Sequence, residues 1–172
     1  MNTADVTDRA PFAGQQTQLW CGEVVSLHRS PRAFLPMGTF AELSLVAGYG
    51  IEGDRYATAS GFYSHKPEEG RQVTFFEVET LEALARDHGV TLRADEHRRN
   101  VTTRGVPLNH LVGKRFRLGG AVVEATRLSV PCKHIEEITG QTVFNLLLNR
   151  SGLNARILQG AVVRVGDPIL PL

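Results

Sequence analysis

The chain has 172 residues, of which 42% are hydrophobic and 22% are charged, and its formal net charge is +1 at pH 7. Both fractions are close to the globular average, which excludes a disordered protein and a coiled coil. The length fits one domain with a core that needs no disulfide or metal to hold it. The even mixture of charges does not favour broad binding to nucleic acid or membrane, although it permits a local basic pocket.

The sequence shows neither a membrane span nor a secretory signal. No apolar stretch approaches the roughly 20 residues that a transmembrane helix needs. Residues 1–18 are polar and lack the apolar segment of a signal peptide. We therefore expect a cytoplasmic protein in which residues 1–18 form a flexible N-terminal segment before a domain over 19–172. Because Cys21 and Cys132 are far apart in such a chain, we expect both thiols to be reduced.

The first half of the chain predicts strands that are joined by loops. Trp20–Leu27 and Thr39–Val46 are rich in apolar and β-branched residues, which favours strands. The prolines within residues 30–36 indicate a loop between them. Residues 57–70 have no periodicity and predict a long loop of the kind that often carries function. Gln72–Phe76 is expected to be a short strand.

A helix is predicted directly after this strand. Apolar residues fall at helical spacing on one face, namely Val78, Leu81, Leu84 and Ala85. Gly89 suits the left-handed position that commonly ends a helix. We also expect Thr74 and Glu77 to form a capping box at its start.

The second half of the chain predicts two β-hairpins. The first joins Arg115–Leu118 to Ala121–Leu128 through Gly119-Gly120, a loop of the kind that primed turns require. The second joins Leu153–Leu158 to Ala161–Val165. A strand, a turn and a short helix are expected at Asn100–Thr103, Leu108–Val112 and Val143–Leu148. Many short strands with glycine turns and few helices predict a β-rich barrel or sandwich.

Cys132 is the main candidate for chemistry. It lies in Ser-Val-Pro-Cys-Lys-His (129–134), where Pro131 is expected to stop a strand and leave the thiol at its end. Nearby basic or polar neighbours are Arg127, Lys133 and His134. Positive charge favours the thiolate, the form that attacks, accepts sulfur or binds a soft metal. A buried structural cysteine is the alternative, and the local sequence does not decide between them. Cys21, in an apolar strand, is expected to fill the core.

Three further segments each place an arginine at the boundary of an element. Gly53-Asp54-Arg55 follows a glycine-rich bend where backbone can approach a ligand closely. The Arg55 guanidinium has the fork geometry that binds phosphate or carboxylate. Arg71-Gln72 opens one strand, and residues 97–100 (His-Arg-Arg-Asn) open another. Each segment alone is equally compatible with an ordinary turn or a surface arginine. No zinc-binding, phosphate-loop or dinucleotide motif accompanies them.

Taken in this order, the motifs resemble the MOSC domain, which is named for the C-terminal part of molybdenum cofactor sulfurases. The resemblance extends over residues 19–172. In its short length the chain is similar to standalone members of the family. The resemblance rests on Gly53-Asp54-Arg55, Arg71-Gln72-Val73, Arg98-Arg99-Asn100 with Gly105, Pro131-Cys132, and residues 155–158 with 165–167. It implies a mainly β fold with a few short helices, a barrel akin to the barrel domain of pyruvate kinase.

The resemblance also implies roles for individual residues. Cys132 would be a molybdenum ligand or a sulfur carrier. The residues implied to contact the pterin phosphate of the molybdenum cofactor (molybdopterin), or to line its pocket, are Gly53, Asp54, Arg55, Arg71, Gln72, Arg98, Arg99 and Asn100. Arg99 stands where the related amidoxime reductases usually have proline. Pyridoxal phosphate is not expected to bind, because the chain has no aminotransferase-like portion.

Three functions follow as hypotheses. In the first, the chain binds molybdenum cofactor and reduces N-hydroxylated compounds with electrons from an electron-transfer protein. In the second, Cys132 carries a persulfide that a cysteine desulfurase supplies, which makes the chain a sulfur carrier or sulfurtransferase. In the third, the chain is a ligand-binding module without catalysis. None of them requires nucleic acid or a membrane.

Overall fold

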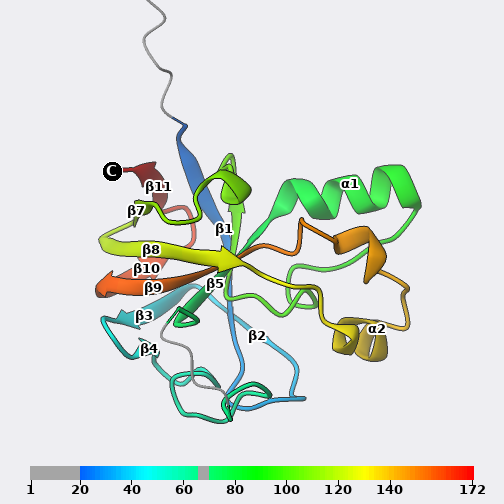
Figure 1. The fold of residues 1–172 in the computed structure, drawn as a ribbon, viewed down its shortest axis with the longest axis horizontal. Coiled ribbons are helices and arrows are strands. Elements are labelled where there is room, and N and C mark those ends of the chain that lie inside the picture. The colour runs from blue at the N-terminus through cyan, green and yellow to red at the C-terminus, as the bar shows by residue number, and fades with distance from the viewer. Residues whose placement is uncertain (1–19, 66–69) are drawn as a thin grey trace, which may run out of the picture.

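The computed structural model describes residues 20–65 and 70–172 (Figure 1). The predicted flexible segment over 1–18 lies outside the described residues, as does residue 19. A sheet with the strand order β11-β7-β8-β9-β5-β6-β1 closes on itself because β11 also pairs with β1. The predicted mainly β barrel is therefore confirmed. The barrel strands are β1 (Gly22–Arg29), β5 (Val73–Glu77), β6 (Val101–Arg104), β7 (Arg115–Leu118), β8 (Ala121–Leu128), β9 (Leu153–Gln159) and β11 (Pro168–Pro171).

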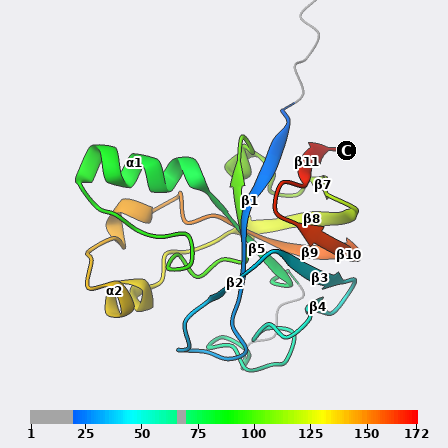
Figure 2. The same ribbon diagram turned by 180° about the vertical axis from the view of Figure 1, so that it is seen from behind.

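The remaining elements lie around this barrel. β2 (Gly38–Phe40) pairs with β1, and a separate sheet contains β3 (Glu42–Val46), β4 (Gly50–Ile51) and β10 (Ala161–Arg164). The helices are α1 (Val78–His88) and α2 (Lys133–Thr139), with short 3₁₀ turns at Leu108–His110 and Asn145–Leu147. Figures 1 and 2, which are opposite views, place α1 and α2 toward one end of the molecule and the small sheet toward the other. None of the helices within residues 20–65 and 70–172 is long and apolar enough to cross a bilayer.

β5 joins two hydrophobic clusters. Successive residues of a strand point to opposite faces, so Phe75 enters the barrel core and Phe76 packs outside it. Within the barrel, the Phe75 ring meets Phe116 edge to face at 5.4 Å between ring centroids. The outer cluster unites α1, α2 and the segments around them through Phe76, Leu84, Leu92, Ile135, Val143 and Leu147. It anchors α2, and with it Cys132, against the barrel.

The predicted helix is present, but its start and its buried face differ from expectation. Gly89 ends α1 at φ 65°, as predicted. The capping box is wrong: Glu77 is the N-cap residue and makes no side-chain cap bond, and its Oε1 instead accepts from Leu108 N at 3.0 Å. Ala85 is exposed, because the helix buries Ala83 and Thr80 with Leu84.

The first predicted hairpin is confirmed, whereas the second is wrong. β7 pairs with β8 through Gly119-Gly120. β9 pairs with β8 and β5, but β10 leaves it and pairs with β3. Gly160 stands at this corner, where a Cβ would collide with the Leu45 carbonyl oxygen. The glycine thus permits a switch between sheets, which local sequence does not distinguish from a hairpin turn.

Other boundaries shift. The predicted strand at Thr39–Val46 is split at Ala41 into β2 and β3, and α2 was not predicted at all. The predicted helix at Val143–Leu148 is only the 3₁₀ turn at its centre. The remaining predicted strands are present with ends displaced by one or two residues.

Gly152 provides a test of the contact between β9 and β5. Its φ is 93°, and a Cβ there would overlap the Phe75 carbonyl oxygen. We expect Gly152→Ala to lower the free energy of unfolding by about 3 kcal/mol or more, because backbone must move. Gly113→Ala is the control: its φ is 78°, and nothing lies within 4 Å of an added Cβ. It should cost only about 1 kcal/mol. Equal losses in urea denaturation would contradict this packing.

Candidate functional site

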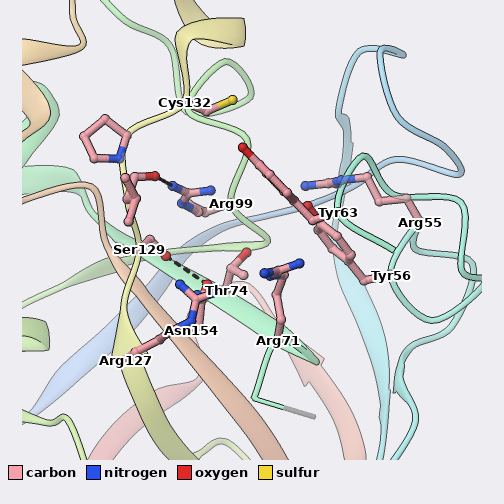
Figure 3. Close-up of a pocket in the computed structure, with 12 residues that line it drawn as sticks. Arg55, Tyr56, Tyr63, Arg71, Thr74, Arg99, Arg127, Ser129, Cys132 and Asn154 are labelled. Atoms are coloured by element: carbon pink, nitrogen blue, oxygen red, sulfur yellow. Dashed lines mark hydrogen bonds between the residues drawn. The ribbon is translucent and has the colours of Figure 1, made fainter. Parts of the chain in front are cut away.

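A cavity of about 370 Å³ lies where the end of β8, the start of β5 and the loop after β4 meet (Figure 3). Its lining combines guanidinium groups, phenol hydroxyls and a thiol, and it includes no carboxylate or imidazole from the described part of the chain. The lining residues are Arg55, Tyr56, Tyr63, Arg71, Thr74, Arg99, Arg127, Ser129, Val130, Pro131, Cys132 and Asn154. This composition makes the cavity strongly attractive to anions.

Cys132 lies between the cavity and the outer hydrophobic cluster. β8 ends at Leu128, and the chain then runs through Pro131 to Cys132, which is the N-cap residue of α2. The side chain packs partly against the outer cluster yet remains partly exposed in the cavity lining. Cys21 is also a free thiol, but it is exposed ahead of β1. The expectation that Cys21 fills the core is therefore wrong.

Arg99 is held rigidly in the wall beside Cys132. Its Nε donates to Ser151 O at 3.0 Å, and its Nη2 donates to Ser151 Oγ at 3.0 Å and to Val130 O at 3.1 Å. Burial lowers the pKa of Arg99 to about 10, with the charge of Arg55 acting in the same direction. The group still carries its charge at neutral pH. No acceptor for its Nη1 occurs among residues 20–65 and 70–172, so this nitrogen remains available to a ligand.

Arg55 is fixed by a buried carboxylate. Arg55 is 4% exposed, and its Nη1 donates to Asp54 Oδ1 at 3.3 Å. Its Nη2 donates to Arg98 O at 3.0 Å. Asp54 in turn accepts from Tyr56 N at 3.1 Å and from Asn100 Nδ2 at 3.1 Å. Asp54 therefore stands behind the cavity wall and orients the arginine that lines it.

Asn100 also acts from behind the wall. Its Oδ1 accepts from Thr74 Oγ1 at 2.7 Å and from Thr74 N at 3.2 Å, and Thr74 lines the cavity. Gln72 holds β9, since its Oε1 accepts from Ile157 N at 2.8 Å. Arg98 Nη1 donates to Leu35 O, and burial lowers the pKa of Arg98 to about 10.

The sequence-predicted residues thus fall into two groups. Arg55, Arg71, Arg99 and Cys132 line one cavity, whereas Asp54, Gln72, Arg98 and Asn100 bond to protein around it, and Gly53 shapes a turn at φ 73°. This left-handed φ favours glycine, and a Cβ there would require the Arg29 guanidinium to move. The arrangement brings the first group together as a site and makes the second group its support.

Two tyrosines that sequence analysis did not single out complete the wall. The Arg71 guanidinium lies 5.2 Å from the ring centroids of both Tyr56 and Tyr63, and the Arg55 guanidinium lies 4.9 Å from that of Tyr56. These cation–π contacts hold the two guanidinium groups against the tyrosine rings. Figure 3 shows the hydroxyl end of Tyr63 directed toward Cys132. Burial raises the pKa of Tyr63, and negative charge on Cys132 adds to this effect, so the hydroxyl stays protonated.

Arg127 is supported by a polar pair. The Asn154 amide lies 2.9 Å from Ser129 Oγ, and with its nitrogen donating to that hydroxyl its oxygen lies 2.8 Å from Arg127 Nη1. All three residues line the cavity. The sequence indicates Arg127 only as a positive charge near Cys132, and Ser129 begins the motif that contains Cys132. Asn154 and Thr74, which lie in strands, gave no local signal of function.

A buried histidine fixes the backbone of Arg99 and gives stability a dependence on pH. His97 Nδ1 accepts from Arg99 N at 3.0 Å, and His97 Nε2 lies 2.8 Å from Thr102 Oγ1. Its ring stacks on Phe76 with centroids 4.3 Å apart. Burial keeps the pKa of His97 well below its usual value, so the imidazole is neutral in the fold.

We therefore expect the free energy of unfolding to be greatest above about pH 6.5, the ordinary histidine pKa, and to fall as the pH drops below it. The unfolded chain takes up a proton there that the folded chain does not. The loss should approach about 1.4 kcal/mol per pH unit from this group. His97→Gln should reduce the slope, whereas His110→Gln, at an exposed position, should keep it. Urea denaturation at several pH values measures both, and identical slopes in the wild type and His97→Gln would contradict the assignment.

Comparison with known proteins identifies the family. A family model described as the MOSC domain matches residues 62–170, more than half of the chain. Among solved structures, the YuaD protein from Bacillus subtilis has a TM-score of 0.73 at 20% identity, covering 88% of this chain and 97% of that one.

YiiM from Geobacillus stearothermophilus has a TM-score of 0.68 at 15% identity, covering 88% of this chain and 75% of that one. YiiM from Escherichia coli has a TM-score of 0.61 at 17% identity, covering 90% and 69%. No curated protein sequence matches. The likeness to these structures concerns the fold, and the family model agrees with it. The chain belongs to the MOSC domain family.

Proposed function

We propose that this chain binds a molybdenum cofactor in the arginine-lined cavity, with Cys132 as the protein ligand to molybdenum, and reduces N-hydroxylated compounds. The observation that carries the proposal is the convergence of Cys132 with Arg55, Arg71, Arg99 and Arg127 on a single cavity. Membership of the MOSC family supports the choice of cofactor.

The residues present fit the chemistry of such a cofactor. A pterin phosphate is an anion, and guanidinium groups bind phosphate through paired, charge-assisted hydrogen bonds. A cysteine thiolate is an anionic sulfur donor that can bind a metal directly. A cavity of about 370 Å³ lies within the size range of small-molecule sites. The described cavity wall holds no carboxylate that would repel the phosphate.

The protein groups are organised before any ligand arrives. Arg99 is held by Ser151 and Val130, and Arg55 by Asp54. Since these side chains are already immobile, binding an anion costs less conformational entropy than ordering free surface arginines would. Tyr63 contributes a protonated hydroxyl on the side of the cavity where Cys132 lies (Figure 3). It can donate a hydrogen bond to a substrate oxygen there.

Reduction of an N-hydroxylated compound requires two electrons, which must come from outside the chain. An N–OH group plus two electrons and two protons gives an N–H group and water, with cleavage of the N–O bond. Bound molybdenum would supply the two electrons, received from an electron-transfer protein. The residues of the chain would bind the cofactor, orient the substrate and restrict water in the cavity.

Cofactor binding is tested by metal and pterin analysis. The wild type and the Cys132→Ser and Cys21→Ser variants would be expressed in a host that makes the cofactor and purified without oxygen. We expect stoichiometric molybdenum and pterin in the wild type and in Cys21→Ser, because Cys21 lies outside the cavity. Cys132→Ser should bind less molybdenum than the wild type because it lacks the thiolate ligand, while the arginines still bind the pterin phosphate. Purified wild-type protein that contains neither molybdenum nor pterin would refute the proposal.

A sulfur-carrier function is the second candidate, and the partial exposure of Cys132 at the cavity favours it. Persulfide transfer needs a thiolate that a partner can reach. After incubation with a cysteine desulfurase and cysteine, mass spectrometry should find one added sulfur atom on Cys132. Cys21 is a stringent control because it is free and more exposed. Labelling of Cys21 alone, or of neither residue, would exclude this function.

A further inference from the structure

A row of aromatic side chains borders the cavity on the side of Tyr63. The Tyr63 ring meets Phe62 edge to face at 4.9 Å between centroids, and Phe62 meets Phe34 at 5.7 Å. Phe34 in turn meets the His134 ring at 4.9 Å. Tyr63 lines the cavity, and His134 follows Cys132 closely in the chain. The row, defined as Phe34, Phe62 and Tyr63, therefore begins in the cavity wall and runs toward α2.

The row is unusually exposed for aromatic residues in mutual contact. The exposed fractions are 62% for Phe34, 55% for Phe62 and 42% for Tyr63. These are three of the four large aromatic residues that are exposed within the described part of the chain. Contiguous exposed apolar surface beside a cavity is typical of a ligand-binding surface, whereas isolated exposed residues carry no such meaning.

The backbone holds Phe34 in an unfavourable conformation. Its φ is 67°, a left-handed value that costs a bulky residue of this kind about 1–2 kcal/mol. Neighbouring bonds enforce it: Ala33 N donates to Ser60 O at 2.9 Å, and the buried Arg98 donates to Leu35 O. Figures 1 and 2 show the loop before β2 beside the loop after β4. The hydrogen bond from Ala33 N to Ser60 O joins these two loops. Strain of this kind persists where the surrounding structure requires it, and it clusters at functional positions.

The row changes from polar at the cavity, where the Tyr63 hydroxyl lies, to apolar outside it. Tyr63 directs its hydroxyl toward Cys132 (Figure 3). Its ring stands at 83° to the ring of Phe62, which lies farther from the cavity. On the wall that carries Cys132, Val130 adds a further exposed apolar side chain at the cavity lining. A ligand with a polar end in the cavity and a flat apolar end outside would match both regions. Aromatic rings favour edge and offset contacts with other aromatic rings.

We propose that Phe34, Phe62 and Tyr63 form a specificity surface that binds an aromatic ring of the substrate while its polar group lies in the cavity near Cys132. The substrate class is then aromatic N-hydroxylated compounds rather than small aliphatic ones. The reaction rests on the proposed function, whereas binding of the ring does not.

The first test compares two substrates that differ in one group, benzamidoxime with a phenyl ring and acetamidoxime with a methyl group. The cofactor-loaded wild type, supplied with a reduced viologen dye, should show a kcat/KM about tenfold higher for the phenyl compound. Phe34→Ala and Phe62→Ala should each lower this ratio several-fold through KM and leave the methyl compound almost unchanged. Val162→Ala, which removes an exposed apolar side chain on β10, should leave the ratio intact.

The second test needs no cofactor and so separates this inference from the proposed function. Phenylphosphonate and methylphosphonate would be titrated into cofactor-free protein and followed by NMR. We expect the arginines to bind both anions and the aromatic row to favour the phenyl compound about tenfold. Phe34→Gly removes the ring and is compatible with a positive φ, so it should abolish the preference without lowering the melting temperature.

The outcomes are distinguishable. No turnover together with an intact phenyl preference refutes the proposed reaction and keeps the specificity surface. Equal binding of the two phosphonates by the wild type refutes the surface, as does a phenyl preference that survives both Phe34→Gly and Phe62→Ala.

Discussion

Several guanidinium groups face one small cavity, and their mutual repulsion is the constraint around which the site is built. The structure holds them in place with fixed acceptors in the wall. Asp54 holds Arg55, backbone carbonyls hold Arg99, and an amide supports Arg127. Because burial lowers the pKa of Arg99 only to about 10, its charge survives at neutral pH. The result is a preorganised cationic cavity, whose repulsion an anionic ligand would relieve.

The barrel makes this arrangement rigid. β5 is buried on both faces, so Phe75 ties it to the barrel core while Phe76 ties it to the outer cluster. The outer cluster fixes α2 and thereby places Cys132 at the cavity instead of on a mobile loop. His97, stacked on Phe76, links the same cluster to the backbone of Arg99. Packing of the outer cluster and placement of the charged groups are therefore coupled. A substitution in the outer cluster should displace Cys132 and Arg99 at the cavity.

The local patterns were sufficient for a β-rich fold, for α1 and for the first hairpin. They left a sandwich open, and the barrel was expected from the resemblance to the MOSC domain. Local pattern failed where a glycine serves packing instead of a turn, as at Gly160, where β10 changes sheets. In the site, motif order grouped Arg55 with Cys132, and both line the cavity. It did not separate lining residues from supporting ones such as Asn100, because only the fold shows which way a side chain points. Tyr63 lies in the loop over residues 57–70, which was expected to carry function, but no motif singled out this residue within the loop.

The central claim is that Cys132 and the arginines act together on one anionic, metal-containing ligand. X-ray absorption at the molybdenum edge of the loaded protein tests it most directly, since this method counts the sulfur atoms around the metal. The account predicts one more sulfur ligand in the wild type than the cofactor itself provides, and loss of that sulfur in Cys132→Ser. A wild-type spectrum with no protein sulfur, or one that is identical in the variant, would contradict it.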